Sequence, residues 1–520
     1  MKANTEIKNT ELEISELEQA HLFDKERDEY LYSDIPYSDI PSEDQMIRYP
    51  VTTLHGCNSR DGTSETRALS ELGNAERLQD KLRNDIHYIY HSKAWLHWVD
   101  GAWVWCHDGA RIRSHAASLY RQIYNEGHTM PAESLLFASW SRTSQKEKTI
   151  VASVSLLKDM EHLRLPFSLL DNSPFHVGIN SAKAVIDLKT GLSRPAKRED
   201  YMTKSLNVNY LGDASKVRRW RVFVQKIFGQ DEELIDWVKR WCGYLLTGST
   251  EEHLFVFCYG LGANGKSVFA ETLTYILGDY AIAITPETLT DSKRSAGGSS
   301  SDIADLIGAR LALCSETEND KALAESLVKS LVSGDSMTAR KLYGNPIQFK
   351  PQFKLMMLGN HKPIIKGNDY GIWRRIRLIP FLHTFKDHNC DLGLLDKLKD
   401  EAPDILAWMI EGCLDWQEKG LSDTPVAIKK ATGDYHEEQD LIGQWISDRC
   451  SVYTRRQTSS ADLYADYKEW CCNNELPAVS NVVFGRSLSE RGLIRKKANG
   501  NSVWQDIVLK KNDIDIPFST

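Results

Sequence analysis

The feature that most constrains this chain is a glycine-rich stretch between an apolar segment and a helix-like segment. Residues 254–259 read Leu-Phe-Val-Phe-Cys-Tyr, residues 260–267 read Gly-Leu-Gly-Ala-Asn-Gly-Lys-Ser, and residues 268–277 follow as a helix-like run. Between a strand and a helix, the pattern G-x-x-x-x-G-K-S indicates a phosphate-binding loop. Glycine allows a tight turn, so successive N–H groups can point at one anion, and the next helix adds its own unpaired N–H groups. The stretch therefore predicts a nucleoside triphosphate site, and a chance glycine-rich turn is the alternative.

Two side chains of this stretch have expected chemical roles. Lys266 is expected to reach the β- and γ-phosphates, and the hydroxyl of Ser267 is expected to hold Mg²⁺. ATP and Mg²⁺ are therefore the expected cofactors. The predicted cofactor-binding residues are Gly260, Leu261, Gly262, Ala263, Asn264, Gly265, Lys266 and Ser267.

Length, charge and cysteine usage narrow the class of protein. A chain of 520 residues has room for about three or four domains. Its net charge of −8 argues against a wholly basic coat for nucleic acid, although a local basic surface is compatible with it. The ten cysteines include no C-x-x-C pair, which favours a reduced compartment and argues against a structural zinc site. There is no signal core and no run of 18 apolar residues, so we expect a cytoplasmic protein with no membrane partner.

The first part of the chain is acidic. Residues 1–50 carry 13 Asp or Glu and 5 Lys or Arg, and they contain a tandem Tyr-Ser-Asp-Ile-Pro repeat over residues 32–41. Such a composition buries too little apolar surface to order itself, so residues 1–73 are predicted to be a mostly disordered tail. A docking segment for a partner is the functional alternative.

Four tryptophans then lie close together in the sequence. Trp95, Trp98, Trp103 and Trp105 flank an Asp-Gly pair, and such a turn between alternating aromatics predicts a β-hairpin. The indoles could form a stacking platform for single-stranded bases, whereas burial in the core of a small sheet is the commoner fate of tryptophan. This part of the chain has no carboxylate cluster typical of a polymerase or primase metal site.

Two further apolar strands are expected to end beside the phosphate-binding loop. The first, residues 310–314, is followed by a Ser-Glu-Thr-Glu run, where an acidic residue would manage Mg²⁺ and the attacking water. Glu316 is the first choice for this role and Glu318 the second; alternatively both begin a solvated helix. The other strand, residues 353–358, leads to Asn360, whose amide can contact the γ-phosphate. The predicted metal ligands are Ser267 and Glu316.

Two basic segments lie among these strands. Residues 337–349 alternate on either side of a Gly-Asn-Pro turn, which predicts a hairpin. Its Arg340 and Lys341 are either solvated or form a DNA-gripping tip. Residues 374–377 read Arg-Arg-Ile-Arg before a strand. An arginine there could neutralise charge on a transferring phosphoryl group, although paired arginines are usually surface residues.

Taken in order, these motifs resemble the superfamily 3 helicases. The motifs are Gly-Ala-Asn-Gly-Lys-Ser at 262–267, Ser-Glu-Thr-Glu at 315–318, Ser-Gly-Asp at 333–335 with Thr-Ala-Arg at 338–340, Gly-Asn-His-Lys-Pro at 359–363 and Gly-Ile-Trp-Arg-Arg at 371–375. Within that superfamily the chain is most similar to the primase–helicases of phages, satellite phages, plasmids and poxviruses. Segments 187–191, 198–204 and 243–248 also resemble their pre-helicase region, so the resemblance covers residues 85–385.

The resemblance implies an AAA+-like fold, a hexameric ring with ATP sites between subunits, and a role for each matching residue. Glu316 matches the second acidic motif, Asn360 the sensor, and Arg374 and Arg375 the arginines supplied across the subunit interface. The hairpin over 340–349 matches the DNA-contacting element of the central pore. The implied catalytic residues are Lys266, Glu316, Asn360, Arg374 and Arg375.

The chain departs from the family pattern in two places. Ser315 occupies the position at which the family has the first acid of an Asp-Glu pair, so Mg²⁺ would rest on Ser267, water and Glu316. No recognisable primase–polymerase domain precedes residue 85, so the isolated chain is expected not to synthesise primers.

The C-terminal part, residues 441–520, is predicted to be a separate winged-helix-like domain. Two helical stripes, over 463–470 and 483–488, precede a basic segment, 493–504, that turns at Asn-Gly. Two helices followed by a basic hairpin are typical of a winged helix, which often binds DNA through its second helix and wing; docking of a protein is the alternative. The predicted DNA-binding residues are Arg340, Lys341, Arg495, Lys496 and Lys497.

The sequence thus predicts an α/β chain with an AAA+-like P-loop NTPase core of the superfamily 3 helicase type, an α+β N-terminal domain and a C-terminal winged-helix-like domain. The expected parts are a tail over 1–73, a pre-helicase domain over 74–217, the ATPase domain over 218–400, a helical connector over 401–440 and the winged helix over 441–520.

The expected function is that of an ATP-dependent, ring-forming replicative DNA helicase of a phage, satellite or plasmid-type mobile element, acting in the cytoplasm of a bacterial host. The expected partners are single-stranded and forked DNA, further copies of the chain in a hexamer, and a separate primase or polymerase. Two alternatives stay open. One is a replication initiator that assembles on an origin without processive unwinding, and the other is a regulatory or defence ATPase that signals to a protein.

Overall fold

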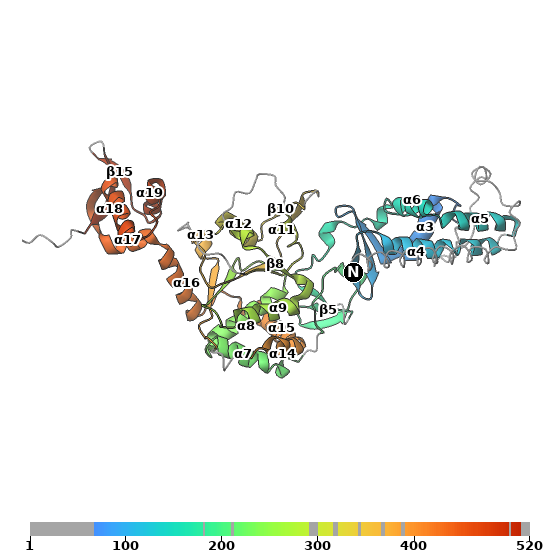
Figure 1. Ribbon diagram of the computed structural model, residues 1–520, viewed down its shortest axis with the longest axis horizontal. Helices are drawn as coiled ribbons and strands as arrows, with labels where there is room; N and C mark the ends of the chain where they lie inside the picture. The colour runs from blue at the N-terminus through green and yellow to red at the C-terminus, as the bar shows by residue number, and fades with distance from the viewer. Residues whose placement is uncertain are drawn as a thin grey trace, which may run out of the picture. The chain divides into compact units, whose positions relative to one another are not determined.

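The computed structural model describes residues 67–129, 131–179, 183–209, 213–290, 300–315, 321–341, 345–365, 370–385, 391–498 and 501–510. The chain divides into two compact units, residues 1–97 with 105–166 and residues 98–104 with 167–520. Figure 1 shows the elements of both units in chain order. The predicted tail lies outside the described residues apart from residues 67–73.

In its described residues, the first unit contains four α-helices and strands of a small sheet. The helices are α3 (Glu71–Leu82), α4 (Ala110–Tyr120), α5 (Ser134–Ser144) and α6 (Glu147–Leu157), and they pack side by side in Figure 1. Helix α3 begins within the last residues of the predicted tail, because the Ser70 hydroxyl accepts the N–H of Gly73 and caps it. Strand β1 (Ile86–Ile89) pairs antiparallel with β2 (Ala94–Val99), with His87 opposite Leu96.

The predicted aromatic hairpin is confirmed. Strand β2 is followed by β3 (Ala102–Cys106) in the same sheet, and the Asp-Gly pair forms the turn between them. Both turn residues adopt the left-handed backbone, with φ of 51° and 91°, as a two-residue hairpin turn requires. Trp95 and Trp103 are buried, whereas Trp98 and Trp105 are half-buried. Two of the four indoles are therefore core residues.

The second unit contains a five-stranded parallel sheet. Its strand order is β13 (Ile376–Pro380), β7 (Phe255–Tyr259), β12 (Lys354–Gly359), β9 (Leu311–Ser315) and β8 (Ala281–Ile284), and every neighbouring pair is parallel. The central strands are buried, which is why they read as continuous apolar runs. The strands expected at 254–259, 310–314 and 353–358 are β7, β9 and β12, so the prediction of an α/β chain is confirmed.

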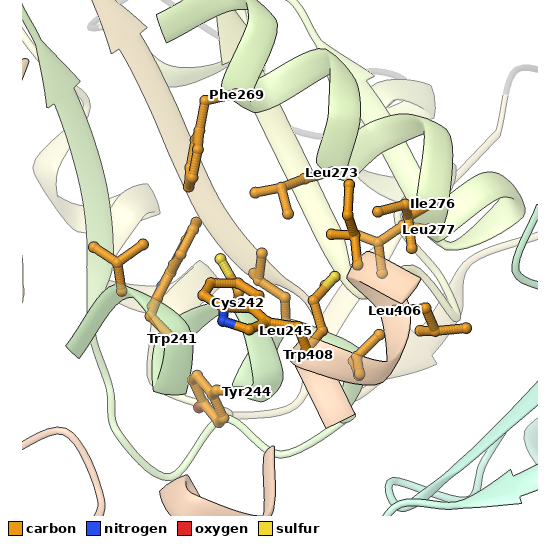
Figure 2. Close-up of a cluster of buried hydrophobic side chains, with 14 of the residues drawn as sticks. Trp241, Cys242, Tyr244, Leu245, Phe269, Leu273, Ile276, Leu277, Leu406 and Trp408 are labelled. Carbon is orange, nitrogen blue, oxygen red and sulfur yellow. The ribbon is translucent and has the colours of Figure 1, made fainter. Parts of the chain in front are cut away.

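One core lies between this sheet and five helices. These are α7 (Arg219–Ile227), α8 (Glu232–Leu246), α9 (Lys266–Leu277), α14 (Leu394–Asp400) and α15 (Ala402–Lys419). Figure 2 shows part of it, where labelled side chains of α8, α9 and α15 meet: Trp241, Cys242, Tyr244, Leu245, Phe269, Leu273, Ile276, Leu277, Leu406 and Trp408. Helices α8 and α15 approach closely because Gly243 has no side chain: a Cβ there would lie 2.0 Å from the Cys413 nitrogen.

Three expected boundaries differ from the structure. The helical run expected over 218–246 is broken between α7 and α8, since Gly229 and Gln230 take left-handed φ values of 64° and 62°. Residues 402–419 belong to the core rather than to a connector, because α15 buries most of its apolar side chains there. Residues 167–217, expected within the N-terminal domain, belong to the second unit.

The reason for the last difference is a three-stranded antiparallel sheet of β4 (His176–Ile179), β5 (Ala184–Asp187) and β6 (Leu192–Pro195). Val177 and Ile186 of this sheet are buried in the same core as α8. Burial of these side chains therefore joins β4–β6 to the parallel sheet.

A second core lies on the other face of the parallel sheet, where α12 (Glu325–Val332), α13 (Tyr370–Trp373) and α16 (Val426–Gln439) pack. Two short helices, α10 (Pro286–Leu289) and α11 (Ser301–Ala304), and a two-stranded ribbon of β10 (Met337–Ala339) and β11 (Ile347–Phe349) complete this side. The ribbon is the hairpin expected over 337–349; residues 342–344, which include the glycine of the expected Gly-Asn-Pro turn, lie outside the described residues.

The C-terminal part has its own core. It consists of α17 (Leu441–Arg449), β14 (Cys450–Ser459), α18 (Ser460–Asn473), α19 (Asn481–Glu490), β15 (Arg495–Ala498) and β16 (Asn501–Leu509). The sheet order is β14-β16-β15, and Trp445, Tyr467, Phe484 and Trp504 are buried together. The two helices and the basic hairpin were expected; α17 and the polar strand β14 were not. In the described part of the chain, no helix is both long enough and apolar enough to span a membrane.

Candidate functional site

The loop between β7 and α9 has the backbone that its glycines allow. Gly262, Ala263 and Gly265 adopt positive φ values of 109°, 46° and 86°. At Gly265 a side chain would not fit, since its Cβ would lie 2.9 Å from Ile227 of α7. The loop can therefore turn directly into the first residue of α9, Lys266, and leave the unpaired N–H groups of that helix at the loop.

The loop is held from both sides by neighbouring strands. The N–H of Gly260 donates to Gly359 at the end of β12, over 3.4 Å. The Asn264 amide donates to the carbonyl of Phe381, which follows β13, over 3.2 Å, and the N–H of Phe385 donates to Ala263 over 2.8 Å. These contacts preorganise the loop, because each one fixes a loop residue to the rigid sheet or to the segment after β13.

Lys266 is the central cation of this site. Its side chain is buried, and its ammonium donates to Gly260 O over 2.5 Å, to Asn264 Oδ1 over 3.1 Å and to Asn360 Oδ1 over 2.9 Å. Asn360 follows β12, which lies beside β7, so the ends of two parallel strands bring the two residues together. The structure thus unites two residues that the sequence predicted to act on the same nucleotide.

These residues line a pocket with a volume of about 860 Å³, a size typical of small-molecule sites. Ser267 and Ser315 lie on its wall with the loop and Asn360. Glu316 and Glu318, the predicted acidic residues, lie outside the described residues. The remaining lining was not predicted: Arg218, Arg219, Val222, Phe223 and Lys226 of the α7 segment, Phe385, and Asp391, Leu394 and Lys397 at α14.

A buried carboxylate joins the two unpredicted walls. Glu401, between α14 and α15, accepts the N–H groups of Arg218, Arg219 and Trp220 over 2.6, 3.0 and 2.8 Å. It therefore caps the start of α7, where a negative charge is stabilising. The sequence carries only a weak signal for this wall. The apolar face of an amphipathic helix does not reveal whether it lines a pocket or packs in a core.

The buried cysteines near the site are neutral thiols. Burial, with a smaller contribution from Glu287, raises the pKa of the Cys314 thiol on β9 to about 12. Burial also raises the pKa of Cys258 on β7, against the opposing effect of Lys266. Neither thiol is activated as a nucleophile. Within the described ranges, His, Cys, Asp and Glu do not gather in threes that could hold a metal.

Arg374 and Arg375 do not reach the Lys266 pocket of their own chain. They precede β13, whose Ile376 pairs with Phe255 at the start of β7, whereas the loop follows the end of β7. A strand of five residues separates the two ends by roughly 16 Å. Arg374 is exposed, and Arg375 is half-buried with its guanidinium donating to Gly371 O over 2.6 Å.

The predicted DNA-binding residues lie on two separate surfaces. Arg340 and Lys341 follow β10 and are exposed, and the Lys341 ammonium pairs with Asp305 over 2.9 Å. Arg495, Lys496 and Lys497 are exposed on β15, the edge strand of the C-terminal sheet. The structure does not bring either set to the Lys266 pocket.

Comparison with known proteins gives several relatives in large DNA viruses. A protein of Acanthamoeba polyphaga mimivirus with the provisional name helicase L207/L206 is 29% identical over 327 residues, which is 59% of this chain and 34% of that protein. A Frog virus 3 protein with the provisional name helicase 022R is 28% identical over 298 residues, 53% of this chain and 30% of that protein. An African swine fever virus protein with the provisional name primase C962R is 24% identical over 254 residues, 45% of this chain and 26% of that protein.

Two family models match the chain. One, described as D5 N terminal like, matches residues 75–229, and the other, described as a family of unknown function (DUF5906), matches residues 258–375. These matches are consistent with a protein of the primase–helicase family. The second match contains all five predicted catalytic residues: Lys266, Glu316, Asn360, Arg374 and Arg375.

The chain spans about a third of the length of the curated relatives it matches. Those relatives are viral, and their names do not point to the bacterial host expected from the sequence. Among solved structures, the apo C-terminal region of NrS-1 is 9% identical with a TM-score of 0.47, covering 85% of this chain and 99% of that chain.

Proposed function

We propose that this chain is an ATP-driven DNA helicase whose catalytic unit is an AAA+-like P-loop core. The observation that carries the proposal is the position of the Lys266 ammonium, 2.9 Å from Asn360 and at the wall of a pocket large enough for a nucleotide. In this proposal the loop N–H groups and Lys266 bind the phosphates, and Asn360 responds to the γ-phosphate.

Mg²⁺ is proposed as the metal of this site. The hydroxyls of Ser267 and Ser315 at the pocket wall are oxygen donors of the kind that Mg²⁺ prefers, and Glu316 would complete the set. The ion supplies neutralisation of charge on the β- and γ-phosphates. Glu316 is proposed to orient the attacking water. Gly260 and Asn264 accept hydrogen bonds from the Lys266 ammonium and so position it to contact the phosphates.

The ring is proposed from the position of the arginines. Arg374 and Arg375 lie at the end of the sheet opposite their own loop, so an arginine that acts on ATP must act on a neighbouring subunit's ATP. A ring, for which the proposed size is a hexamer, supplies such neighbours. Arg374 is the better candidate, because its side chain is exposed whereas Arg375 is bound to Gly371.

DNA is proposed to contact the β10–β11 hairpin through Arg340 and Lys341, and the C-terminal domain, taken as a winged helix, through Arg495, Lys496 and Lys497. Exposed basic residues on a hairpin and on an edge strand suit phosphate contacts. Helicase and primase names among the relatives support DNA as the substrate. A separate primase or polymerase is the proposed partner.

The test is unwinding of forked DNA with 5′ or 3′ tails by the wild-type chain, by Lys266→Ala and by Glu316→Gln. The wild-type chain is expected to unwind one fork, Lys266→Ala to lose ATP hydrolysis, and Glu316→Gln to bind ATP and stall. ATP-dependent assembly on DNA without strand separation would favour a replication initiator. ATP hydrolysis that no DNA stimulates, without unwinding, would favour a signalling ATPase.

A further inference from the structure

A second cleft lies in the second unit, away from the Lys266 pocket. It has a volume of about 540 Å³, which is in the range of small-ligand sites. Residues of the aromatic hairpin turn and of the β6–η8 segment (η8, Arg198–Asp200) surround it. Its lining residues are Trp98, Asp100, Gly101, Lys183, Pro195, Ala196, Lys197, Arg198 and Glu199.

The cleft is held open by contacts beneath it. The buried Trp103 donates its indole N–H to Arg198 O over 2.8 Å and its backbone N–H to Met202 O over 3.0 Å. Asp200 accepts two hydrogen bonds from Arg194, over 2.9 and 2.6 Å, and one from the N–H of Lys197, over 2.7 Å. Both walls of the cleft are therefore fixed without any ligand.

Two residues at the hairpin end of the cleft, Asp100 and Lys183, have a left-handed backbone, with φ values of 51° and 50°. They lie together, because a Cβ on Gly101 would lie only 2.9 Å from the Lys183 Cβ. Asp100 takes this value as a residue of the two-residue hairpin turn.

The lining combines an aromatic ring with three cations and two carboxylates. Trp98 is the aromatic residue of this lining; it is half-buried, and the Arg198 guanidinium lies 5.5 Å from the centre of its ring. Lys183 pairs with Asp100 over 2.8 Å, but both side chains are largely exposed, so the pair is weak and a phosphate can replace it. Lys197 is exposed and forms no ion pair within the described residues. An aromatic ring beside several cations suits a base and its phosphate.

We propose that this cleft binds one nucleotide of single-stranded DNA, with the base against Trp98 and the phosphate at Lys183 or Lys197. A base within a duplex is stacked on its neighbours, so a single strand fits this cleft and a duplex does not. The identity of the strand as DNA rests on the proposed function, whereas the cleft itself does not depend on ATP. The site would hold the strand at a second point, separate from the β10–β11 hairpin.

The first test measures binding of a fluorescein-labelled oligo(dT) strand by anisotropy, with no nucleotide present. Trp98→Ala is expected to weaken binding by roughly fivefold or more, the loss of one stacked base, and Trp98→Phe to restore most of it. Trp105→Ala is the matched control, because Trp105 is also half-buried on the hairpin but does not line the cleft. Equal binding by Trp98→Ala and wild type, or equal losses in Trp98→Ala and Trp105→Ala, overturns the proposal.

The second test does not depend on replacing tryptophan. A strand with 5-iododeoxyuridine is cross-linked by light, and the protein peptide attached to it is identified by mass spectrometry. We expect a cross-link at Trp98. Excess unlabelled single strand should remove this cross-link, and excess duplex should not. Cross-links confined to other peptides, or equal competition by duplex, overturn the proposal. Lys183→Gln/Lys197→Gln should also lower the salt dependence of binding by about 0.7, the loss of one phosphate contact.

Failure of this site and failure of the proposed function give different results. If the wild-type chain binds the strand through Trp98 but hydrolyses no ATP, the helicase proposal is wrong and the proposed DNA site stands. If the chain is an active, DNA-stimulated ATPase but Trp98→Ala binds the strand as wild type does, the proposed DNA site is wrong and the helicase proposal stands.

Discussion

The ammonium of Lys266 lies 2.9 Å from the side-chain oxygen of Asn360, 94 residues further along the chain. The same ammonium is held by Gly260 O and Asn264 Oδ1. A γ-phosphate that approaches Lys266 must therefore displace the Asn360 oxygen from the ammonium or share the ammonium with it. The contact links nucleotide occupancy of the loop to the end of β12.

Asn360→Ala should therefore lower turnover far more than nucleotide binding. Two acceptors would still hold Lys266, so binding of a fluorescent ATP analogue should change by only a few-fold. Hydrolysis should fall by roughly 10²-fold, the cost of losing one oriented polar contact in a transition state. Steady-state hydrolysis and analogue titration measure the two effects, with Lys266→Ala as the inactive reference. Wild-type turnover in Asn360→Ala would show that the contact is only structural.

Arg374→Ala and Lys266→Ala should each be nearly inactive and should complement one another when mixed. Loss of an arginine that acts across an interface costs about 10³-fold or more. Mixed subunits place some intact loops beside some intact arginines, so part of the ATP hydrolysis should return once subunit exchange has been shown. Arg375→Ala should instead lower the unfolding temperature, because Arg375 donates to Gly371. Complementation by Arg375→Ala and not by Arg374→Ala would reverse the assignment.

Lys362→Met should slow hydrolysis by several-fold with little change in KM. Its ammonium lies 2.6 Å from Glu438 of α16 and 5.1 Å from the ring centre of Tyr259, the last residue of β7. It thereby ties the segment after Asn360 to the strand that leads into the loop. Lys239→Met is the matched control, because Lys239 pairs with Glu411 over 2.8 Å with nearly the same exposure, 19% against 15% for Lys362. Equal effects of both changes on kcat would mean that the Lys362 pair contributes stability alone.

Asp305→Asn should strengthen binding of single-stranded DNA by about two- to fivefold at low salt. The exposed Asp305–Lys341 pair contributes at most about 1 kcal/mol, so its loss frees Lys341 for a phosphate at little cost in stability. Lys341→Ala should weaken binding and lower the salt dependence by about 0.7. The double variant should behave as Lys341→Ala alone. An effect of Asp305→Asn that persists in the double variant would assign it to some other contact.

Lys354 should make stability depend on pH. It is buried at the start of β12, where its ammonium donates to Thr247 O, and burial lowers its pKa well below the ordinary value of 10.5, with Arg310 adding to the effect. The unfolded chain therefore binds more protons than the folded chain between that lowered pKa and 10.5. Across this window the free energy of unfolding rises with pH.

The test of that dependence is urea unfolding of wild type and Lys354→Met over a series of alkaline pH values. The rise in unfolding free energy with pH should be smaller in Lys354→Met than in wild type. Identical slopes in the two proteins would mean that Lys354 has the same pKa in the folded and unfolded chains.

The loop and the strands beside it could be predicted because their signals are local. Residues 260–267 are contiguous, and the positive φ values of Gly262 and Gly265 are a property of those residues themselves. Buried strands appear in the sequence as continuous apolar runs. Parallel strands end at the same edge of a sheet, so Lys266 and Asn360 could be expected to lie close together. The Asp-Gly turn of the aromatic hairpin is local in the same way.

Contacts between distant segments were decided only by the tertiary structure. Nothing in the residues of α15 distinguishes a connector from a core helix; Gly243 and Gly412 matter because two helix backbones meet there. Glu401 caps α7 across 181–183 residues of chain. Trp98 and Trp103 lie side by side, with ring centres 5.4 Å apart, yet one lines a cleft and the other is buried. An indole has the same tendency to be buried at both positions, so its exposure depends on which distant segment covers it.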